Sequence, residues 1–293
     1  MAQGDELADG VLYEMHPDAP NARTQGTDVR IMTSNILAHR WTNTTAYGRI
    51  RPVEQRVEIY AATLASSAPD AVGVQETDEK WIIALPLYLK RLADEYGIEY
   101  EWLFYDYDNR QTLTTVLYRK DKLDLVAGDI DSFSVWKKPE YYNRGYHIRL
   151  VEWALLRDRT GTDSSFIIVN THWGTDFPSE IAEEIALVNE LRAKYGVPIF
   201  CTGDFNRRET TEEHAYFIKS ICGASTREQA ALAGTLANVT GGIGKMGDPR
   251  DAGTFYIDHI FGVGEYSVLK YETLLGHNNY LSDHSPHIAD IKF

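Results

Sequence analysis

The sequence carries carboxylates, an amide and a histidine in two short segments whose composition suits the activation of water. Ser282-Asp283-His284 places a carboxylate beside the one side chain that titrates near neutral pH. Gly203-Asp204-Phe205-Asn206 places a carboxylate and an amide two positions apart, after a glycine. Such groups can direct water at a phosphorus centre, particularly when a divalent cation is present. The two segments therefore point to phosphoester hydrolysis and raise the question of which residues hold the cation.

Polar residues also follow several short apolar runs along the chain. Runs of this length that are rich in β-branched and aromatic residues are typical of buried strands. The polar residues that follow such runs are Asn35, Gln75-Glu76, Asn170-Thr171-His172, Asp204 and Asp258. Because ligand sites in α/β proteins commonly lie at the carboxyl ends of strands, we expect these groups to meet along one rim of a sheet.

Amphipathic helices are predicted between these runs. Apolar residues at helical spacing predict helices over residues 51–67, 81–95 and 179–194. Thr210, with Glu213 three positions later, forms a capping-box pattern that predicts a helix running towards Ser220. Further strands are predicted over residues 113–118 and 148–156. This order of elements indicates an α/β protein that is rich in sheet.

Length and composition indicate one large folded unit. The chain has 293 residues, of which 43% are hydrophobic, so it can bury a substantial core. No linker rich in Gly, Ser and Pro divides it, and we expect residues 1–29 to form an N-terminal extension and residues 30–293 a single catalytic domain. The two cysteines, Cys201 and Cys222, do not make a disulfide framework.

The start of the chain and the net charge bear on location and partners. The first residues are acidic and lack the apolar stretch of a signal peptide, and no apolar run reaches the ~20 residues that cross a bilayer. We therefore expect a cytoplasmic protein without a membrane span, although a natural leader missing from this sequence would leave the same reading. Nothing in the sequence indicates an obligate protein partner. The net charge of −14 argues against a dedicated nucleic-acid partner, because polyanion binding depends on Lys and Arg.

The ordered set of polar motifs resembles that of the endonuclease/exonuclease/phosphatase superfamily. That superfamily includes deoxyribonuclease I, abasic-site endonucleases, inositol polyphosphate 5-phosphatases, bacterial sphingomyelinases and deadenylases. The matching residues are Asn35, Gln75-Glu76, Asn170-Thr171-His172, Gly203-Asp204-Phe205-Asn206, Asp258 and Ser282-Asp283-His284. The resemblance runs over about residues 30–293 and implies a deoxyribonuclease I-like, four-layer α/β/β/α sandwich with metal-dependent phosphoesterase activity.

The resemblance also implies which residues bind the cation. By their positions in the motifs, Glu76 is the main carboxylate ligand, Asn35 lies close to it, and Asp283 contributes directly or through water. Oxygen ligands of this kind suit Mg²⁺, which usually keeps several waters and takes one or two carboxylates. We therefore expect Mg²⁺ as the cofactor, with Mn²⁺ or Ca²⁺ as substitutes.

The catalytic roles follow from the same resemblance. Asp204 would orient or deprotonate the attacking water, and Asn206 would hold that water or a phosphoryl oxygen. His284 would contact the phosphate as a general base or as a stabiliser of the transition state, and Asp258 would pair with His284 and fix its tautomer. His172 would be a second imidazole that faces the phosphate.

Three further positions are of interest in the middle of the chain. Arg149 and Tyr146 lie where members of the superfamily often place groups that contact the substrate. Glu152 is an unexpected charge in a predicted strand, and the sequence offers no account of it. The sequence contains no His-Glu-x-x-His zinc signature and no Gly-x-Ser-x-Gly nucleophile motif, so it indicates direct attack by water without a covalent intermediate.

The leading interpretation is a Mg²⁺-dependent phosphatase or phosphodiesterase that acts on a small phosphorylated molecule, such as a sugar, a lipid headgroup or a nucleotide. A DNA or RNA nuclease of the same fold is the alternative, for which Arg207-Arg208 and Lys137-Lys138 are the basic pairs near the motifs. A non-catalytic binding protein is disfavoured, because every matched position holds a chemically competent residue.

Overall fold

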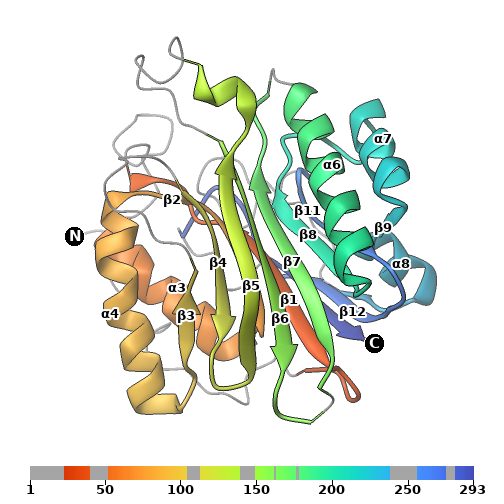
Figure 1. The fold of residues 1–293 in the computed structure, drawn as a ribbon. Helices are drawn as coiled ribbons and strands as arrows, with labels where there is room; N and C mark the ends of the chain where they lie inside the picture. Colours follow the sequence, from red (N-terminus) through yellow and green to blue (C-terminus); the bar gives the residue numbers. More distant parts are fainter. Residues whose placement is uncertain are drawn as a thin grey trace.

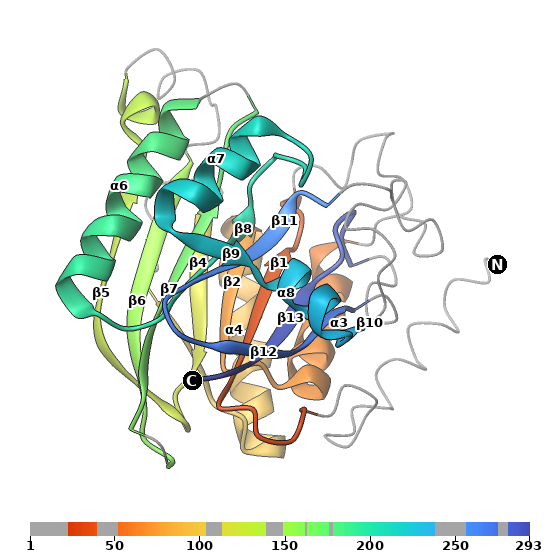
Figure 2. The ribbon, with the colours of Figure 1, turned by 90° about the vertical axis from the view of Figure 1, so that its right-hand side faces the viewer.

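Two β-sheets pack face to face, and helices cover both outer faces (Figure 1, Figure 2). The computed structural model describes residues 23–39, 52–103, 113–138, 149–161, 163–175, 178–237, 256–274 and 281–293. Within these residues the layers follow the order helix, sheet, sheet, helix. The predicted four-layer α/β/β/α fold is therefore confirmed.

The first sheet has the strand order β10-β12-β13-β1-β2-β4-β3. Its strands are β1 (Val29–Asn35), β2 (Ala71–Thr77), β3 (Tyr100–Trp102), β4 (Leu113–Arg119), β10 (Leu236–Ala237), β12 (Ser267–Thr273) and β13 (His287–Lys292). β1 and β2 run parallel, with Asn35 opposite Gln75, whereas β13 pairs antiparallel with β1. The carboxyl ends of β1 and β2 therefore lie at the same edge.

The second sheet has the strand order β5-β6-β7-β8-β11-β9. Its strands are β5 (Leu123–Ser132), β6 (Leu150–Asp158), β7 (Ser165–His172), β8 (Ile199–Asp204), β9 (Gly223–Ser225) and β11 (Asp258–Val263). β7 and β8 run parallel, with His172 opposite Asp204. β11 runs antiparallel to β8, with Asp258 opposite Asp204. Residues 172, 204 and 258 therefore share one edge of this sheet.

Helices lie on both sides of the paired sheets. They are α3 (Val53–Ser67), α4 (Glu79–Tyr96), the short 3₁₀ helix η3 (Ser134–Lys137), α6 (Pro178–Tyr195), α7 (Glu212–Ile221) and α8 (Thr226–Ala233). α3 and α4 cover the first sheet, and α6 and α7 cover the second (Figure 1). α8 lies beside β11 and β12, as Figure 2 shows. No helix of the described residues is both long and apolar enough to cross a membrane.

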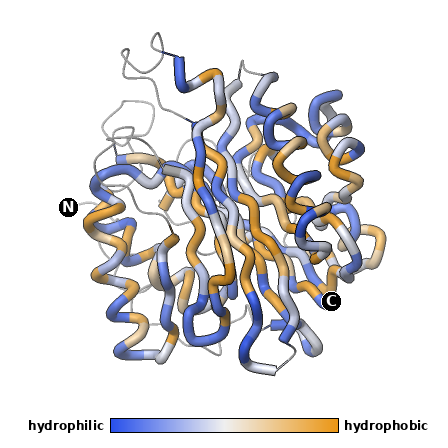
Figure 3. The backbone as a smooth tube through the Cα atoms, in the orientation of Figure 1, coloured by the Kyte–Doolittle hydropathy of each residue, from blue (hydrophilic) through white to orange (hydrophobic). Residues whose placement is uncertain are grey.

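Alternation along the strands explains why the layers form. In β1, Ile31 belongs to the core between the sheets, whereas Met32 packs beneath α3 and α4. In β7, Ile168 belongs to the core between the sheets and Ile167 to the core beneath α6 and α7. Because successive side chains point to opposite faces, a strand that is covered on both faces must be apolar throughout. Figure 3 shows hydrophobic residues along several central strands.

The two sheets approach each other closely around Gly73 of β2. A Cβ at this position would lie 2.0 Å from Thr202 Oγ1 and 2.4 Å from Asn170 Oδ1, so no larger residue fits. Asn170 of β7 donates hydrogen bonds across the interface to the carbonyl oxygens of Val74 (3.0 Å) and Thr115 (2.8 Å) of the first sheet. The Asn170 side chain therefore joins the two sheets by hydrogen bonds just below the edge that carries the motifs.

The predicted elements agree with the structure except in two details. The predicted helices and strands over residues 51–67, 81–95, 113–118, 148–156 and 179–194 correspond to α3, α4, β4, β6 and α6. The predicted cap at Thr210 is wrong by one residue: Thr211 caps α7, and its hydroxyl accepts a hydrogen bond from the backbone N–H of His214. Asp258 begins β11 rather than following a strand, and it reaches the common edge because β11 is antiparallel to β8.

Residues 23–28, which fall in the predicted N-terminal extension, contact the first sheet. The Arg23 guanidinium donates to both oxygens of Asp70, at 2.5 and 2.8 Å. The backbone N–H of Thr24 donates to Asp290 Oδ2 at 2.8 Å. The part of the extension that the structure describes is therefore packed against the predicted catalytic domain.

Candidate active site

The polar strand ends of both sheets meet at one edge of the sandwich. Asn35 ends β1, His172 ends β7, Asp204 ends β8 and Asp258 begins β11. Asn35 Nδ2 donates to Asp204 Oδ2 at 3.1 Å, which joins the first sheet to the second. The expectation that these polar groups lie together is therefore confirmed.

Glu76 reaches this edge through a break in the strand pattern. Gln75, its neighbour in β2, points between the sheets and donates to Asn170 Oδ1 at 2.6 Å, so regular alternation would direct Glu76 towards the helices. The pairing of β2 with β4 shifts register between Val74 and Thr77, and Glu76 has a φ of 66°. A bulge of this kind redirects a side chain. The backbone at Glu76 is strained, and such strain is common at functional sites.

The Glu76 carboxylate is fixed at both oxygens. Oε1 accepts a hydrogen bond from Asn35 Nδ2 at 3.2 Å, and Oε2 accepts one from the backbone N–H of Ala38 at 3.0 Å. Burial alone would raise the pKa of Glu76, but the attraction of His172 and the bond from Ala38 outweigh burial and lower the pKa. Glu76, which is partly exposed, is therefore an anion near neutral pH.

Asp204 lies at the centre of the cluster. Oδ2 is 3.3 Å from His172 Nε2 and 3.9 Å from His284 Nε2, and Oδ1 accepts a hydrogen bond from the backbone N–H of Asn206 at 2.9 Å. Burial would raise the pKa of Asp204, but the two histidines and the bond from Asn206 outweigh it and hold the pKa far below the ordinary value. Asp204 is therefore ionised near neutral pH.

Asn206 is held in a tight loop after β8. Its φ of 49° lies in the left-handed region, which asparagine tolerates better than most residues. Asn206 Nδ2 donates to the carbonyl oxygen of Trp173 at 2.7 Å. Arg207 donates from Nη2 to the carbonyl oxygen of Thr175 at 3.0 Å, so the loop after β8 is tied twice to the loop after β7.

His284 forms the expected pair with Asp258. Its Nδ1 lies 2.7 Å from Asp258 Oδ2, and both side chains are buried. Burial would lower the pKa of His284, but the attraction of Asp258 and Asp283 outweighs burial and raises the pKa well above its ordinary value. Burial raises the pKa of Asp258. The pair therefore holds a proton over a wide pH range, with His284 Nε2 directed towards Asp204.

His172 differs from His284 in its charge. Burial and the nearby Arg149 guanidinium lower the pKa of His172, against the opposing attraction of Asp204. One imidazole of the cluster is therefore neutral and the other is protonated near neutral pH. Environments that push the pKa values of two titratable groups apart assign them different chemical roles.

Of the two predicted substrate-contacting residues, the structure describes Arg149. Its positive charge lowers the pKa values of Glu76 and His172, which places the guanidinium beside the cluster. Its Nε is buried and has no hydrogen-bond partner among the described residues. Tyr146 lies outside the described residues.

The donor set at this edge fits a hard divalent cation. Burial raises the pKa of Asp283, and the charges of Glu76 and Asp204 raise it further against the attraction of His284. Three carboxylates therefore lie close together, and Asn35 donates from Nδ2 to two of them while its Oδ1 accepts from the backbone N–H of Leu37. Carboxylate and amide oxygens are the ligands that Mg²⁺, Mn²⁺ and Ca²⁺ prefer.

One subset of the cluster is less suited to a cation. Asp204, Asp258 and His284 each offer one ligand atom within 4.8 Å of the others. His284 Nδ1 is already engaged with Asp258, however, and this arrangement serves to orient an imidazole.

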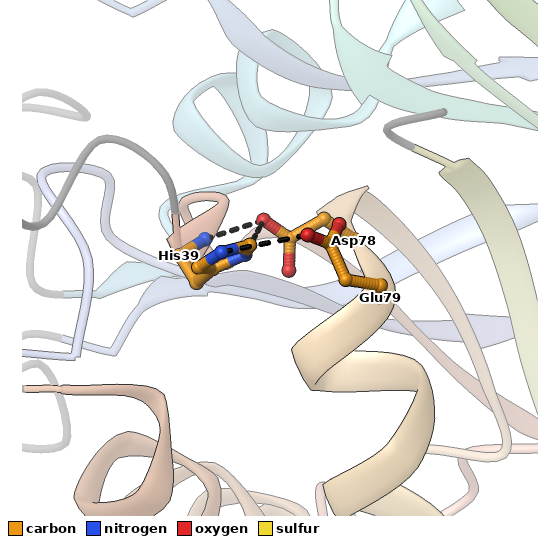
Figure 4. Close-up of side chains that lie close together, drawn as sticks. All are labelled: His39, Asp78 and Glu79. Atoms are coloured by element: carbon orange, nitrogen blue, oxygen red, sulfur yellow. Dashed lines mark hydrogen bonds and ion pairs between the residues drawn. The ribbon is translucent and has the colours of Figure 1, made fainter. Parts of the chain in front are cut away.

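A second group of titratable side chains joins the segment after β1 to the segment after β2 (Figure 4). Asp78 Oδ2 accepts from the backbone N–H of His39 at 2.6 Å and lies 2.6 Å from His39 Nδ1. His39 Nε2 lies 3.5 Å from Glu79 Oε1. Asp78 is fully buried, so this contact fixes the end of the loop that leaves β1.

Sequence reasoning missed two buried glutamates of α6 that support the site. Glu184 Oε2 accepts a hydrogen bond from Trp173 Nε1 at 2.6 Å. Glu180 accepts hydrogen bonds from Trp136 Nε1 and, at 2.5 Å, from the backbone N–H of Gly174. These contacts hold the segment that receives Asn206. Two acidic residues four positions apart on a helix are typical of a solvent-exposed face. No local pattern in the sequence distinguishes these buried glutamates from exposed ones.

Glu152, which the sequence left unexplained, lies in the core of the sandwich. It is fully buried at the position of β6 that pairs with Asn170 of β7. Burial raises the pKa of Glu152 well above its ordinary value, against smaller opposing effects of Val116 and Thr115. Burial therefore favours the neutral form of this side chain.

The chain belongs to the endonuclease/exonuclease/phosphatase family, whose sequence model matches residues 32–284. Members of this family are phosphoesterases. No curated protein sequence matches the chain.

Several solved structures share the fold. An endonuclease/exonuclease/phosphatase from Bacteroides vulgatus is 21% identical, with a TM-score of 0.70 over 90% of this chain and 98% of that one. A mannosyl-6-phosphatase from Bacteroides thetaiotaomicron is 20% identical, with a TM-score of 0.69 over 90% and 100%. The catalytic domain of human Nocturnin with bound sulfate is 19% identical, with a TM-score of 0.66 over 93% and 96%. At these identities the likeness shows the fold alone.

Proposed function

We propose that this protein is a divalent-cation-dependent hydrolase that cleaves a phosphoester bond of a small phosphorylated molecule by direct attack of water. The observation that carries the proposal is the position of Asp204 between two imidazoles, with Oδ2 3.3 Å from His172 Nε2 and 3.9 Å from His284 Nε2. An ionised carboxylate lies between a neutral imidazole, His172, and a protonated one, His284. Such a site can accept a proton from water on one side and stabilise phosphoryl charge on the other.

The roles of the residues follow from their contacts. Asp204 orients or deprotonates the water, and Asn206, held by Trp173, positions the water or a phosphoryl oxygen. His284, oriented by Asp258, donates a hydrogen bond to a phosphoryl oxygen as negative charge develops. His172 donates to Asp204 and completes the alignment.

Glu76, Asp283 and Asn35 are the residues that would hold Mg²⁺, or Mn²⁺ or Ca²⁺ in its place. Held there, such a cation would neutralise phosphoryl oxygens and orient the ester. The fit rests on the fixed, ionised Glu76 carboxylate and on its proximity to the two aspartates.

The basic residues near the site favour a small substrate over nucleic acid. Arg207 donates to the carbonyl oxygens of Asn206 and Thr175, so its guanidinium supports the loop. Lys137 is paired with Asp131 at 2.7 Å. With a net charge of −14, the chain offers little of the positive surface that a nucleic-acid backbone requires. Arg149 remains as a cation beside the cluster that can contact a second anionic or polar group of a small substrate.

The test is hydrolysis of p-nitrophenyl phosphate and of bis(p-nitrophenyl) phosphate in EDTA-treated protein, with and without added Mg²⁺. We expect turnover that requires the cation and that falls roughly 100-fold or more in Asp204→Asn. Asp163→Asn is the matched control, because Asp163 is 89% exposed in the turn between β6 and β7, at the far end of β7 from His172. Turnover that is unchanged in Asp204→Asn would overturn the assignment. Preference for the diester, followed by cleavage of oligonucleotides, would favour a nuclease.

A further inference from the structure

Arg56 of α3 is a fully buried cation that contacts two segments of the candidate site. Its Nη1 donates to the carbonyl oxygens of Ile36 (2.6 Å), Leu37 (2.8 Å) and Leu281 (3.0 Å). The side chain has no exposed surface. Residues 36–37 follow Asn35, and residue 281 precedes Ser282-Asp283-His284, so one guanidinium joins segments that are far apart in the sequence.

The first of these segments is the loop of residues 36–39. Leu37 N–H donates to Asn35 Oδ1 at 3.0 Å, Ala38 N–H to Glu76 Oε2 at 3.0 Å, and His39 N–H to Asp78 Oδ2 at 2.6 Å. The loop therefore orients Asn35 and Glu76 through its own N–H groups. Its shape is strained, because Leu37 has a φ of 57° and a leucine rarely adopts the left-handed region.

The carbonyl groups of the same loop need partners on the other side. Arg56 takes the carbonyl oxygens of Ile36 and Leu37, and Trp81 Nε1 donates to the carbonyl oxygen of Leu37 at 3.0 Å. These donors balance the strain at Leu37, because buried carbonyl groups without partners destabilise a conformation.

The second segment carries the histidine side of the site. His284 N–H donates to Ser282 Oγ at 3.2 Å, which forms a turn immediately after Leu281. Displacement of Leu281 would therefore be transmitted to Asp283 and His284 through three residues of chain. The hydrogen bond from Arg56 to Leu281 fixes the position of this turn relative to the loop of residues 36–39.

Burying a guanidinium group costs free energy unless hydrogen bonds and opposite charges compensate for the lost water. Burial lowers the pKa of Arg56 to about 10, against the attraction of Asp78, Asp283 and Glu76, so it remains charged at neutral pH. Nε and Nη2 have no hydrogen-bond partner within the described part of the chain, and the guanidinium lies 5.1 Å from the centre of the Trp81 ring. The charge is thus retained at a cost in desolvation, which its three carbonyl contacts and the nearby carboxylates offset.

We propose that Arg56 is a positioning residue that holds residues 36–39 and residues 281–284 at a fixed separation, so that the Glu76 side of the site faces the His284 side. For its effect on turnover the proposal rests on the proposed function. The clamp itself is a property of the fold and can be tested without a substrate.

The test compares Arg56→Lys with Arg30→Lys. Arg30 is a second buried arginine, and it donates to Asp290 at 2.6 and 2.9 Å and to the carbonyl oxygen of Ser67 at 2.5 Å. It lies in β1 roughly 16 Å from Asn35, at the opposite end of the strand. Its replacement should destabilise the protein without moving the two segments, which makes it the matched control.

The primary measurement is amide hydrogen exchange, resolved by residue or by short peptide. In Arg56→Lys we expect exchange at Leu37, Ala38 and His39 and also at His284 to accelerate roughly tenfold or more beyond that in Arg30→Lys. Trp81→Phe, which removes the indole donor to Leu37 and keeps an aromatic ring beside Arg56, should loosen residues 36–39 more than residues 281–284. The proposal would be overturned if both segments exchanged at the same rate in Arg56→Lys as in Arg30→Lys. It would also be overturned if only residues 36–39 exchanged faster in Arg56→Lys.

The second measurement is the kinetics of the ester that the wild-type protein hydrolyses. We expect kcat to fall at least tenfold in Arg56→Lys with KM changed less than about threefold, because orientation of bound groups is lost rather than substrate affinity. Loss of activity in proportion to loss of folded protein would indicate a merely structural role. An inactive wild-type protein would contradict the proposed function, and the exchange pattern would still decide the role of Arg56. If Arg56→Lys does not fold, Arg56→Gln, which keeps two amide donors, takes its place.

Discussion

The buried Glu184 carboxyl group makes the stability of the protein depend on pH in a predictable way. Burial raises its pKa from 4.5 to about 8, against the hydrogen bond from Trp173 Nε1. Between these values the folded protein keeps a proton that the unfolded chain releases. The contribution of Glu184 to stability is therefore fully present below about pH 4.5 and is lost as the pH rises towards 8. Glu184→Gln, which resembles the protonated acid and cannot ionise, should remove this dependence.

The size of the effect follows from the pKa shift. Within the window, one bound proton changes the free energy of unfolding by about 1.4 kcal/mol per pH unit. From pH 5.5 to 7.5 the wild-type protein should therefore lose up to about 3 kcal/mol relative to Glu184→Gln. At roughly 2–4 °C per kcal/mol for a chain of this size, the difference in melting temperature should grow by roughly 5–10 °C.

The assay is thermal unfolding followed by circular dichroism at both pH values. Glu190→Gln is the matched control, because Glu190 lies exposed on the same helix. It should show the wild-type dependence on pH. If the difference in melting temperature between Glu184→Gln and the wild-type protein is the same at pH 5.5 and 7.5, Glu184 is not a neutral acid in the folded protein and the reasoning fails.

Three further predictions concern the site and its support. Asp258→Asn leaves His284 without its carboxylate partner, and kcat should fall roughly 100-fold or more with little change in melting temperature; wild-type kcat would contradict the pair's role. Asn170→Ala leaves two carbonyl groups between the sheets without donors and should cost about 2–5 kcal/mol in urea unfolding, well above Asn189→Ala, which loses one partly exposed bond. Mg²⁺ at 100 times its Kd should stabilise the protein by about 2.7 kcal/mol, and Glu76→Gln should abolish most of this gain; an equal gain in the variant would exclude Glu76 as a ligand.

The strand pattern explains why much of the site could be predicted from the sequence. In β1, β7 and β8 the residues between the sheets are apolar in the middle of the strand and polar at its end, as with Ile31 and Asn35. Parallel pairing then brings the ends together without any long-range knowledge. The Gln75-Glu76 motif predicts Glu76 as a metal ligand. Its position depends on a bulge in β2, which alternation alone would not have predicted.

The remaining features depend on contacts that no local pattern records. Arg56 lies on an amphipathic helix where an arginine is normally solvated, and only its contact with Leu281, 225 positions away, shows its role. The proton on Glu184 arises from burial beneath Trp173, which requires the packed helix α6. The prediction that a strand precedes Asp258 is wrong, because Asp258 is the first residue of β11. β11 runs antiparallel to β8, so its first residue, and not its last, lies at the site.

The measurement that tests the central claim most directly is hydrolysis in ¹⁸O-labelled water, with mass spectrometry of both products. If water activated at Asp204 attacks phosphorus, the wild-type protein with Mg²⁺ releases phosphate or phosphomonoester that carries one ¹⁸O, and Asp204→Asn releases almost none. Label in the alcohol product, or labelled phosphate formed equally by Asp204→Asn, would contradict the account.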